Sequence, residues 1–212
     1  MDGIDQGVRA VVLDLGGVVL RICRSWGQGC EATGVPLRPE PLRRMLQPGV
    51  EDVVAAYQSG RMDLDAFAAA LSERSGGGYA AAEVRRVHEG WILGEYPGAR
   101  DLVMRLRDRG VPTIALSNTC GAHWRLMPSF PAFAAIDHRI GSHLVGACKP
   151  DAAMYAAAER LLPPGDGVIA FFDDTPGNVT AATARGWSAH QVDPDGDPPG
   201  RIEAVLRGLG MR

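Results

Sequence analysis

The sequence has few cysteines, no long apolar run and no block of like charge. Its four cysteines among 212 residues form no C-x-x-C pair and are too sparse for a disulfide framework, so we expect reduced thiols. No stretch approaches the roughly 18 apolar residues of a membrane span. The opening MDGIDQGVRA also lacks the pattern of a signal peptide. We therefore expect a cytoplasmic protein that binds no membrane.

The charge balance makes nucleic acid an unexpected partner. The chain has 22 Lys and Arg against 25 Asp and Glu, a formal net charge of -3, and these charges form no basic run. A small molecule is the better expectation. The length predicts one large domain, or a core with a smaller insertion, and leaves the oligomeric state open.

Four short apolar runs, each ending near a polar residue, predict the buried strands of a parallel sheet. They are residues 9–14 (RAVVLD), 111–117 (VPTIALS), 167–173 (GVIAFFD) and, more weakly, 188–192. Helical patterns lie between them at residues 97–109, 151–162 and 176–185. This alternation predicts an α/β fold with a doubly wound parallel sheet.

The segment from 21 to 96 interrupts this alternation, because we find only helical patterns in it. The helices are expected at residues 41–45, 50–58, 63–74 and 81–93, with Asp63 as an N-cap. We therefore predict a core domain made of residues 1–20 and 97–212, and an all-helical cap made of residues 21–96. The insertion follows the first strand, so it would rise from the carboxyl edge of the sheet, where ligands bind in such folds.

Polar side chains follow three of the predicted strands: Asp14, the pair Ser117 and Asn118, and the pair Asp173 and Asp174. The carboxyl ends of parallel strands share one edge of a sheet, so these side chains are expected to converge. Two carboxylates ~4 Å apart repel by about 4 kcal/mol at an effective dielectric constant of ~20. A divalent cation would offset this repulsion. Oxygen ligands without a competing His or Cys spacing favour Mg²⁺ over zinc.

Lys149, in the sequence CKPD ahead of a predicted helix, adds a positive charge to this group. A site that combines carboxylates, Mg²⁺, a lysine and small hydroxyl or amide donors suits a phosphoryl group, whose charge is spread over three oxygens.

These residues carry a resemblance to the haloacid dehalogenase (HAD) superfamily of phosphohydrolases, along nearly the whole chain. Its four motifs occur in order as DLGGV (residues 14–18), SN (117–118), KPD (149–151) and DD (173–174), the last followed by Gly177 and Asn178. The insertion is similar to the helical cap of one subgroup. The resemblance implies a Rossmann-like core.

The resemblance also implies roles in phosphoryl transfer. Asp14 would be the nucleophile and form an aspartyl-phosphate that water hydrolyses. Ser117 would hydrogen-bond the phosphoryl oxygens, with Asn118 as a further phosphate-binding residue. Lys149 would neutralise charge on the nucleophile and on the phosphoryl group.

The implied Mg²⁺ site consists of Asp14, the backbone carbonyl of Gly16, Asp173 and, directly or through water, Asp174. Gly16 departs from the family, which usually has a second Asp there as general acid and base. That proton transfer contributes roughly 10²–10⁴-fold. A sugar 1-phosphate or an acyl phosphate has a leaving group that needs little protonation, so such a substrate would tolerate the absence of this general acid. A similar Asp-x-Gly motif occurs in glucose-1-phosphate phosphatases and in the phosphatase-like domains of epoxide hydrolases.

We thus expect a Mg²⁺-dependent phosphatase that acts on a small phosphorylated metabolite, with a sugar phosphate as one candidate. Two alternatives remain open: a hydrolase of the 2-haloacid dehalogenase type, and a non-catalytic binding or regulatory protein with the same fold. The cap offers Arg24, Trp26 and His88 among possible substrate contacts, and the sequence does not choose between them.

Overall fold

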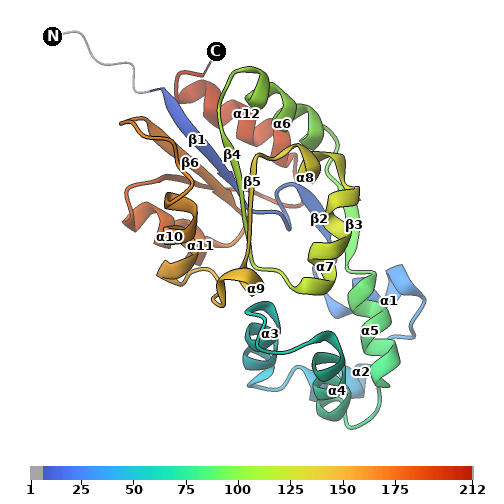
Figure 1. Ribbon diagram of the computed structural model, residues 1–212. Coiled ribbons are helices and arrows are strands. Elements are labelled where there is room, and N and C mark those ends of the chain that lie inside the picture. The colour runs from blue at the N-terminus through green and yellow to red at the C-terminus, as the bar shows by residue number, and fades with distance from the viewer. Residues whose placement is uncertain (1–6, 212) are drawn as a thin grey trace, which may run out of the picture.

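The computed structural model describes residues 7–211, which contain a five-stranded parallel sheet in the order β5-β4-β1-β6-β7 (Figure 1). The strands are β1 (Val8–Leu13), β4 (Thr113–Ser117), β5 (His138–Gly141), β6 (Val168–Asp173) and β7 (Ser188–Gln191). The start of the predicted core segment, residues 1–6, and residue 212 lie outside the described part. No helix within residues 7–211 has the length and apolar character to cross a membrane.

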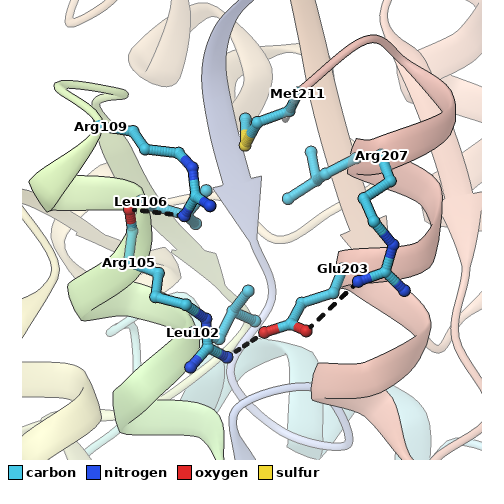
Figure 2. A pocket seen from close by; sticks show the side chains of 8 residues that line it. Leu102, Arg105, Leu106, Arg109, Glu203, Arg207 and Met211 are labelled. Atoms are coloured by element: carbon cyan, nitrogen blue, oxygen red, sulfur yellow. Dashed lines mark hydrogen bonds and ion pairs between the residues drawn. The ribbon is translucent and has the colours of Figure 1, made fainter.

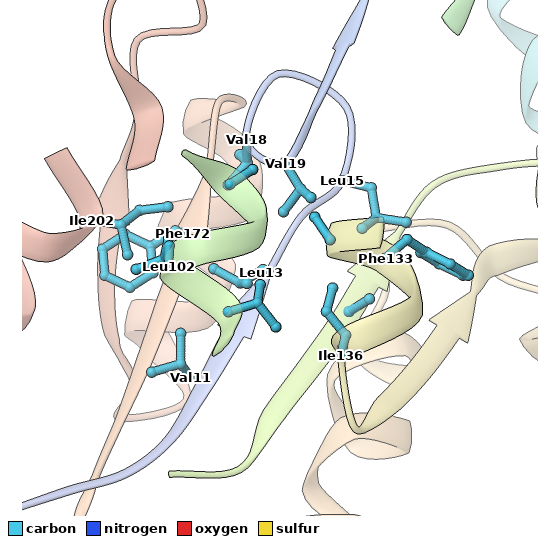
Figure 3. Packing of buried hydrophobic residues seen from close by; sticks show 14 of the residues in the cluster. Val11, Leu13, Leu15, Val18, Val19, Leu102, Phe133, Ile136, Phe172 and Ile202 are labelled. Atoms are coloured by element: carbon cyan, nitrogen blue, oxygen red, sulfur yellow. The ribbon is translucent and has the colours of Figure 1, made fainter. Parts of the chain in front are cut away.

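Strand β1 lies at the centre of the sheet, and its apolar run is buried on both faces. Val11 and Leu13 pack in one hydrophobic core with Leu102, whereas Val12 packs in the other with Tyr155 (Figure 3). Helices α6 (Ala99–Asp108), α8 (Pro131–Ala135) and α12 (Pro198–Gly208) cover the first face; α10 (Ala152–Glu159) and α11 (Pro176–Ala184) cover the second. This arrangement confirms the doubly wound α/β fold.

Five helices of the insertion pack around a separate hydrophobic core that includes Tyr57, Phe67 and Tyr79. We call them the cap helices: α1 (Trp26–Thr33), α2 (Pro39–Met45), α3 (Val50–Gln58), α4 (Leu64–Arg74) and α5 (Ala81–Glu89). Asp63 begins α4 as predicted, and its side chain accepts a hydrogen bond from the Ala66 amide. In Figure 1 the cap helices lie beyond the end of the sheet at which β1 and β4 finish.

The insertion is not helical throughout, which corrects the all-helical prediction for residues 21–96. Its two ends form an antiparallel pair, β2 (Leu20–Ile22) with β3 (Ile92–Glu95). The helix expected over 81–93 ends at Glu89 instead, with Gly90 as its C-cap. Pairing between segments about 70 residues apart leaves no periodic signal in either segment alone. The division into a core and a cap at residues 20 and 96 remains our proposal.

Three short helices connect the strands near this end of the sheet. They are α7 (Gly121–Leu126), the 3₁₀ turn η1 (Met127–Ser129) and α9 (Ser142–Val145). Strand β5 was not predicted, because only two residues of its HRIG sequence are buried and the other two are charged or polar. The four cysteines are all free.

Candidate active site

The predicted convergence of carboxylates is present at the ends of two adjacent strands. Leu13 of β1 pairs with Phe172 of β6, so the residues that follow them, Asp14 and Asp173, lie side by side. The Asp14 amide donates to the Phe172 carbonyl at 2.9 Å. Carboxylate oxygens of Asp14, Asp173 and Asp174 all lie within 4.8 Å of one another. The sheet register therefore creates a concentrated negative charge.

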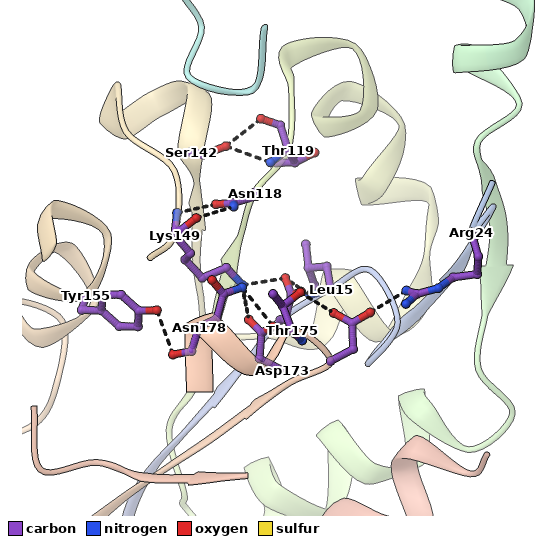
Figure 4. Close-up of polar contacts among 12 residues, drawn as sticks. Leu15, Arg24, Asn118, Thr119, Ser142, Lys149, Tyr155, Asp173, Thr175 and Asn178 are labelled. Carbon is purple, nitrogen blue, oxygen red and sulfur yellow. Dashed lines mark hydrogen bonds and ion pairs between the residues drawn. The ribbon is translucent and has the colours of Figure 1, made fainter. Parts of the chain in front are cut away.

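Lys149 is buried between two of these carboxylates (Figure 4). Its Nζ atom lies 2.6 Å from Asp173 Oδ2 and 3.0 Å from Asp14 Oδ1. Burial raises the pKa of Asp14 to about 7, which Lys149 opposes and Asp173 reinforces. Although burial favours the neutral amine, the two carboxylates raise the pKa of Lys149. One ammonium group thus only partly offsets the charge of three carboxylates.

Asp173 is held in place by neutral donors as well as by Lys149. Asn178, on α11, donates from Nδ2 to both Asp173 oxygens at 3.0 and 3.1 Å, and the Thr175 amide donates at 2.8 Å. The Asn178 carbonyl in turn accepts from the Tyr155 hydroxyl. These contacts fix the carboxylate orientation before any ligand binds. Asn178, which follows the DD motif in the sequence, therefore supports the site through Asp173.

Asn118 lies at the site, but its side chain contacts the protein backbone. Its Nδ2 donates to the Lys149 carbonyl at 2.9 Å, and its Oδ1 accepts from the Lys149 amide at 2.7 Å (Figure 4). Asn118 therefore holds the loop that carries the buried lysine. Its neighbour Ser117 ends β4, is 3% exposed and lies next to the strand of Asp14.

Asp174 faces a cation from the insertion. Arg24, just ahead of α1, forms an ion pair with Asp174 Oδ2 (Figure 4). The turn after β1 permits this position of Asp174, because Gly17 has φ +79° and a Cβ atom there would lie 2.6 Å from Asp174 Oδ2. Glycine is therefore required at position 17, because the backbone there is left-handed and because a side chain would collide with the Asp174 carboxylate.

A cavity of about 530 Å³ begins beside these residues and extends under the cap helices. Gly16, Ser117 and Asn118 line its inner end, and the rest of the lining comes mainly from the cap helices, the β2–β3 pair and the α7–η1 region. The cavity therefore lies between the sheet edge and the insertion, where the sequence predicted a ligand site.

A smaller hollow of about 240 Å³ lies between α6 and α12, on one face of the sheet (Figure 2). Its charged side chains contact one another, since Glu203 pairs with Arg105 and also lies 3.7 Å from Arg207. None of the candidate site residues lines it, whereas Gly16, Ser117 and Asn118 line the larger cavity. We do not assign it a function.

The cavity wall contains a group of side chains that the sequence did not reveal. His88 from α5 and Tyr57 from α3 meet Cys120 and His123 of the α7 region. His88 Nε2 lies 3.4 Å from Cys120 Sγ and 2.9 Å from the Tyr57 hydroxyl, and His123 Nε2 lies 2.8 Å from the His88 carbonyl. The histidines have no ligand-like spacing in the sequence, and their convergence depends on the insertion folding back onto the core.

This group favours ionisation of the cysteine. Burial opposes a charged thiolate, but hydrogen bonds with His123 and His88 outweigh it and lower the pKa of Cys120 to about 4. Burial also lowers the pKa of His88, whereas the contact with Cys120 raises that of His123 despite burial. The pKa shifts of Cys120 and His123 both favour the charged forms, the thiolate of Cys120 and the imidazolium of His123.

One hydroxyl joins the sheet edge to the cap helices. Ser142 Oγ accepts from the Thr119 amide at 2.8 Å, and lies within donating distance of two carbonyls, Thr119 at 2.9 Å and Gln58 at 2.6 Å. Gln58 ends α3, whereas Thr119 follows β4. Ser142 therefore contacts both walls of the cavity.

The site and the fold together define a hydrolase with a HAD-like core. The model of the haloacid dehalogenase-like hydrolase family matches residues 8–186, so the chain belongs to that family. The chain is 29% identical over 117 residues to a phosphatase, MT3486, of Mycobacterium tuberculosis, and this match covers 54% of each protein. The chain thus spans about half the length of that curated relative.

Two solved structures show the same fold. A HAD-like family hydrolase from Porphyromonas gingivalis is 24% identical, with a TM-score of 0.73 over 94% of this chain and 98% of that one. A HAD family enzyme from Bacteroides thetaiotaomicron, in complex with magnesium and inorganic phosphate, is 19% identical, with a TM-score of 0.68 over 90% and 97%. At these identities the likeness concerns the fold alone.

Proposed function

We propose that the chain is a Mg²⁺-dependent phosphatase that hydrolyses a small phosphorylated metabolite through Asp14. The observation that carries this proposal is the group of three converging carboxylates around one buried lysine. The phosphatase relative and the magnesium and phosphate complex of the Bacteroides enzyme support it.

The donor set fits Mg²⁺. It offers oxygen atoms only, and the three carboxylates of Asp14, Asp173 and Asp174 exceed the two positive charges that contact them, Lys149 and Arg24. Asp14, Asp173 and the Gly16 carbonyl would hold the ion, with Asp174 binding directly or through water. When bound, Mg²⁺ neutralises phosphoryl oxygens and favours the ionised form of Asp14.

The protein residues then have distinct roles. The Asp14 carboxylate attacks phosphorus, the bond to the leaving oxygen breaks, and water later hydrolyses the aspartyl-phosphate to phosphate and free Asp14. Lys149 and Ser117 hold the phosphoryl oxygens as negative charge develops. Asn118 positions Lys149. Because position 16 has no carboxyl group, the leaving alcohol takes its proton from water or from another group in the cavity.

The test is phosphate release from acetyl phosphate and para-nitrophenyl phosphate, with and without EDTA. We expect chelation to abolish turnover and added Mg²⁺ to restore it. Asp14→Asn should lower kcat by at least about 10³-fold, whereas Asp101→Asn, on the exposed face of α6, serves as a matched control without effect. Turnover that survives EDTA, or that persists in folded Asp14→Asn, contradicts the proposal.

Each of the two alternative functions predicts a different experimental result. In a metal-free dehalogenase the three carboxylates would be balanced only by Lys149 and Arg24, and the remaining negative charge is disfavoured at a buried site. Halide release from a 2-haloacid in the presence of EDTA would support it. A non-catalytic protein would stay folded and release no phosphate from any ester.

A further inference from the structure

The cavity beside Asp14 has a polar end and an apolar end. Ser117 and Asn118 lie at the inner end, at the edge of the sheet where Asp14 is found. The far wall comes from the cap helices and is built mainly of apolar side chains, which are Met45 and Leu46 at the end of α2, Val50 and Val54 of α3, and Phe67 and Leu71 of α4. A phosphoryl group at the polar end therefore directs the leaving group towards an apolar surface.

Several polar side chains that line the cavity are already engaged with the protein, whereas Trp26 Nε1 and Thr119 Oγ1 are buried in the lining residues without a hydrogen-bond partner among residues 7–211. The Arg24 guanidinium pairs with Asp174. The Tyr57 hydroxyl contacts His88, and both polar atoms of the Asn118 side chain bond the backbone of Lys149. Beyond these two atoms, a leaving group with several hydroxyls would break existing contacts or leave some of its own hydroxyls unpaired, and both cost binding free energy.

The size of the cavity suits a small organic group. Its volume of about 530 Å³ falls within the roughly 300–1,000 Å³ of small-molecule sites. The rings of Trp26 and Trp91 also line it, and they offer broad apolar faces. Such a wall stabilises a ring or a branched chain better than a polyol.

We propose, on the basis of the phosphatase function above, that the substrate is the phosphate monoester of an apolar alcohol, aromatic or branched aliphatic. The cavity wall thus favours this class over the sugar phosphates that the sequence offered as candidates. The phosphoryl group binds at Asp14, and the apolar body of the alcohol lies against the side chains of α2, α3 and α4.

The experiment compares esters that differ in hydroxyl content while the reacting bond stays the same. Cyclohexylmethyl phosphate and glucose 6-phosphate both carry the phosphate on a CH₂ group attached to a six-membered ring. Benzyl and 3-methylbutyl phosphates extend the apolar set, and ribose 5-phosphate and glycerol 3-phosphate extend the polyol set. We expect kcat/KM of the best apolar ester to exceed that of the best polyol ester by at least about tenfold.

A matched pair of variants tests the wall itself. Val54→Thr keeps the side-chain shape and places a hydroxyl on the cavity wall. Val53→Thr makes the same change one residue earlier, at a side chain that also packs against the core of the cap helices but does not line the cavity. Val54→Thr should lower kcat/KM for cyclohexylmethyl phosphate roughly tenfold. Val53→Thr should leave it within about twofold, provided that the variant is folded.

The outcomes separate this inference from the proposed function. Acetyl phosphate has almost no leaving group to place against the wall, so its Mg²⁺-dependent hydrolysis reports on the phosphatase site alone. If acetyl phosphate is hydrolysed but polyol esters equal or exceed the apolar esters, the substrate class is wrong and the phosphatase remains. If acetyl phosphate and all six esters are inert, the proposed function fails and the substrate class fails with it.

Discussion

The Nζ atom of Lys149 lies 2.6 Å from Oδ2 of Asp173, and both side chains are completely buried. Oδ1 of Asp14 lies 3.0 Å from the same nitrogen. A buried ion pair of this kind contributes little when compared with apolar residues, but removal of one partner leaves the other charge without compensation. We therefore expect the lysine to contribute to stability as well as to the proposed chemistry of the site.

Lys149→Met should destabilise the protein strongly in the absence of divalent cations. We expect the free energy of unfolding to fall by about 3–5 kcal/mol, because Asp14 and Asp173 lose their buried counter-charge. Urea denaturation in EDTA measures this loss. Added Mg²⁺ should restore part of the stability by supplying positive charge to the same carboxylates.

The control for this prediction is an exposed ion pair. Arg185 contacts Glu159, and their side chains are 29% and 34% exposed, so Arg185→Met should cost no more than about 1 kcal/mol. Equal losses in the two variants would show that the buried lysine has no special role in stability.

Asn118→Ala should impair catalysis through Lys149 and leave phosphate affinity largely intact. The variant removes both hydrogen bonds that hold the Lys149 backbone, and a displaced catalytic group can cost about 10²-fold. We expect kcat to fall by roughly that factor, with KM changed little. A rise in KM at constant kcat would instead support the direct phosphate contact that the family resemblance implied for Asn118.

Gly16→Asp would supply the carboxyl group that the family usually has at this position. The structure shows why the single substitution is strained: a Cβ atom on Gly16 would lie 2.9 Å from Cδ1 of Ile22. We therefore predict that Gly16→Asp alone loses stability and that Ile22→Val, which removes this methyl group, restores it. In the double variant, esters with poor leaving groups should be hydrolysed faster, by up to roughly 10²–10⁴-fold.

Thermal unfolding and steady-state kinetics on an alkyl phosphate test the two parts of this prediction separately. Ile22→Val alone is the control for the effect of the smaller side chain. A stable double variant with no gain on alkyl phosphates would mean that proton transfer to the leaving oxygen does not limit the rate.

Cys120 should be a thiolate at neutral pH. Its pKa is lowered from 9.0 to about 4 by hydrogen bonds with His123 and His88, which exceed the opposing effect of burial. The difference in absorbance at 240 nm between wild type and Cys120→Ser should therefore persist at pH 6. Because the folded state releases this proton more readily than the unfolded state, the stabilisation is full above pH 9 and is lost as the pH falls towards 4.

Cys148 is the internal reference for this prediction. Its side chain is more exposed than that of Cys120, but burial raises its pKa. The absorbance lost on Cys148→Ser should appear only at alkaline pH. A Cys120 signal that disappears below pH 8 would contradict the assignment of the thiolate.

Most of the sheet could be predicted because its inner strands are buried on both faces, and their sequences are therefore continuous apolar runs. Val11, Val12 and Leu13 carry this signal in β1. The antiparallel pair β2 and β3 and the edge strand β5 could not be predicted in this way. Arg21 is exposed in β2, and His138 and Arg139 are exposed in β5, so neither strand has an apolar run.

The carboxylate cluster could be predicted for a related reason. Asp14 and Asp173 directly follow parallel strands, and parallel strands bring their ends together whatever the separation in sequence. The cluster of His88 and Cys120 had no such signal, because one residue belongs to a cap helix and the other to the turn after β4. Its formation depends on how the insertion packs on the core, which no local pattern encodes.

Ser142 has a single hydroxyl proton, with the carbonyls of Gln58 and Thr119 both within its reach. If α3 moved away from the sheet, the Ser142 hydroxyl could donate to the Thr119 carbonyl in place of the Gln58 carbonyl, so the serine would keep a hydrogen-bond acceptor. Water would reach the vacated Gln58 carbonyl at the same moment. Separation of α3 from the sheet at this point exchanges one hydrogen bond for others, so this contact by itself adds little resistance to their separation.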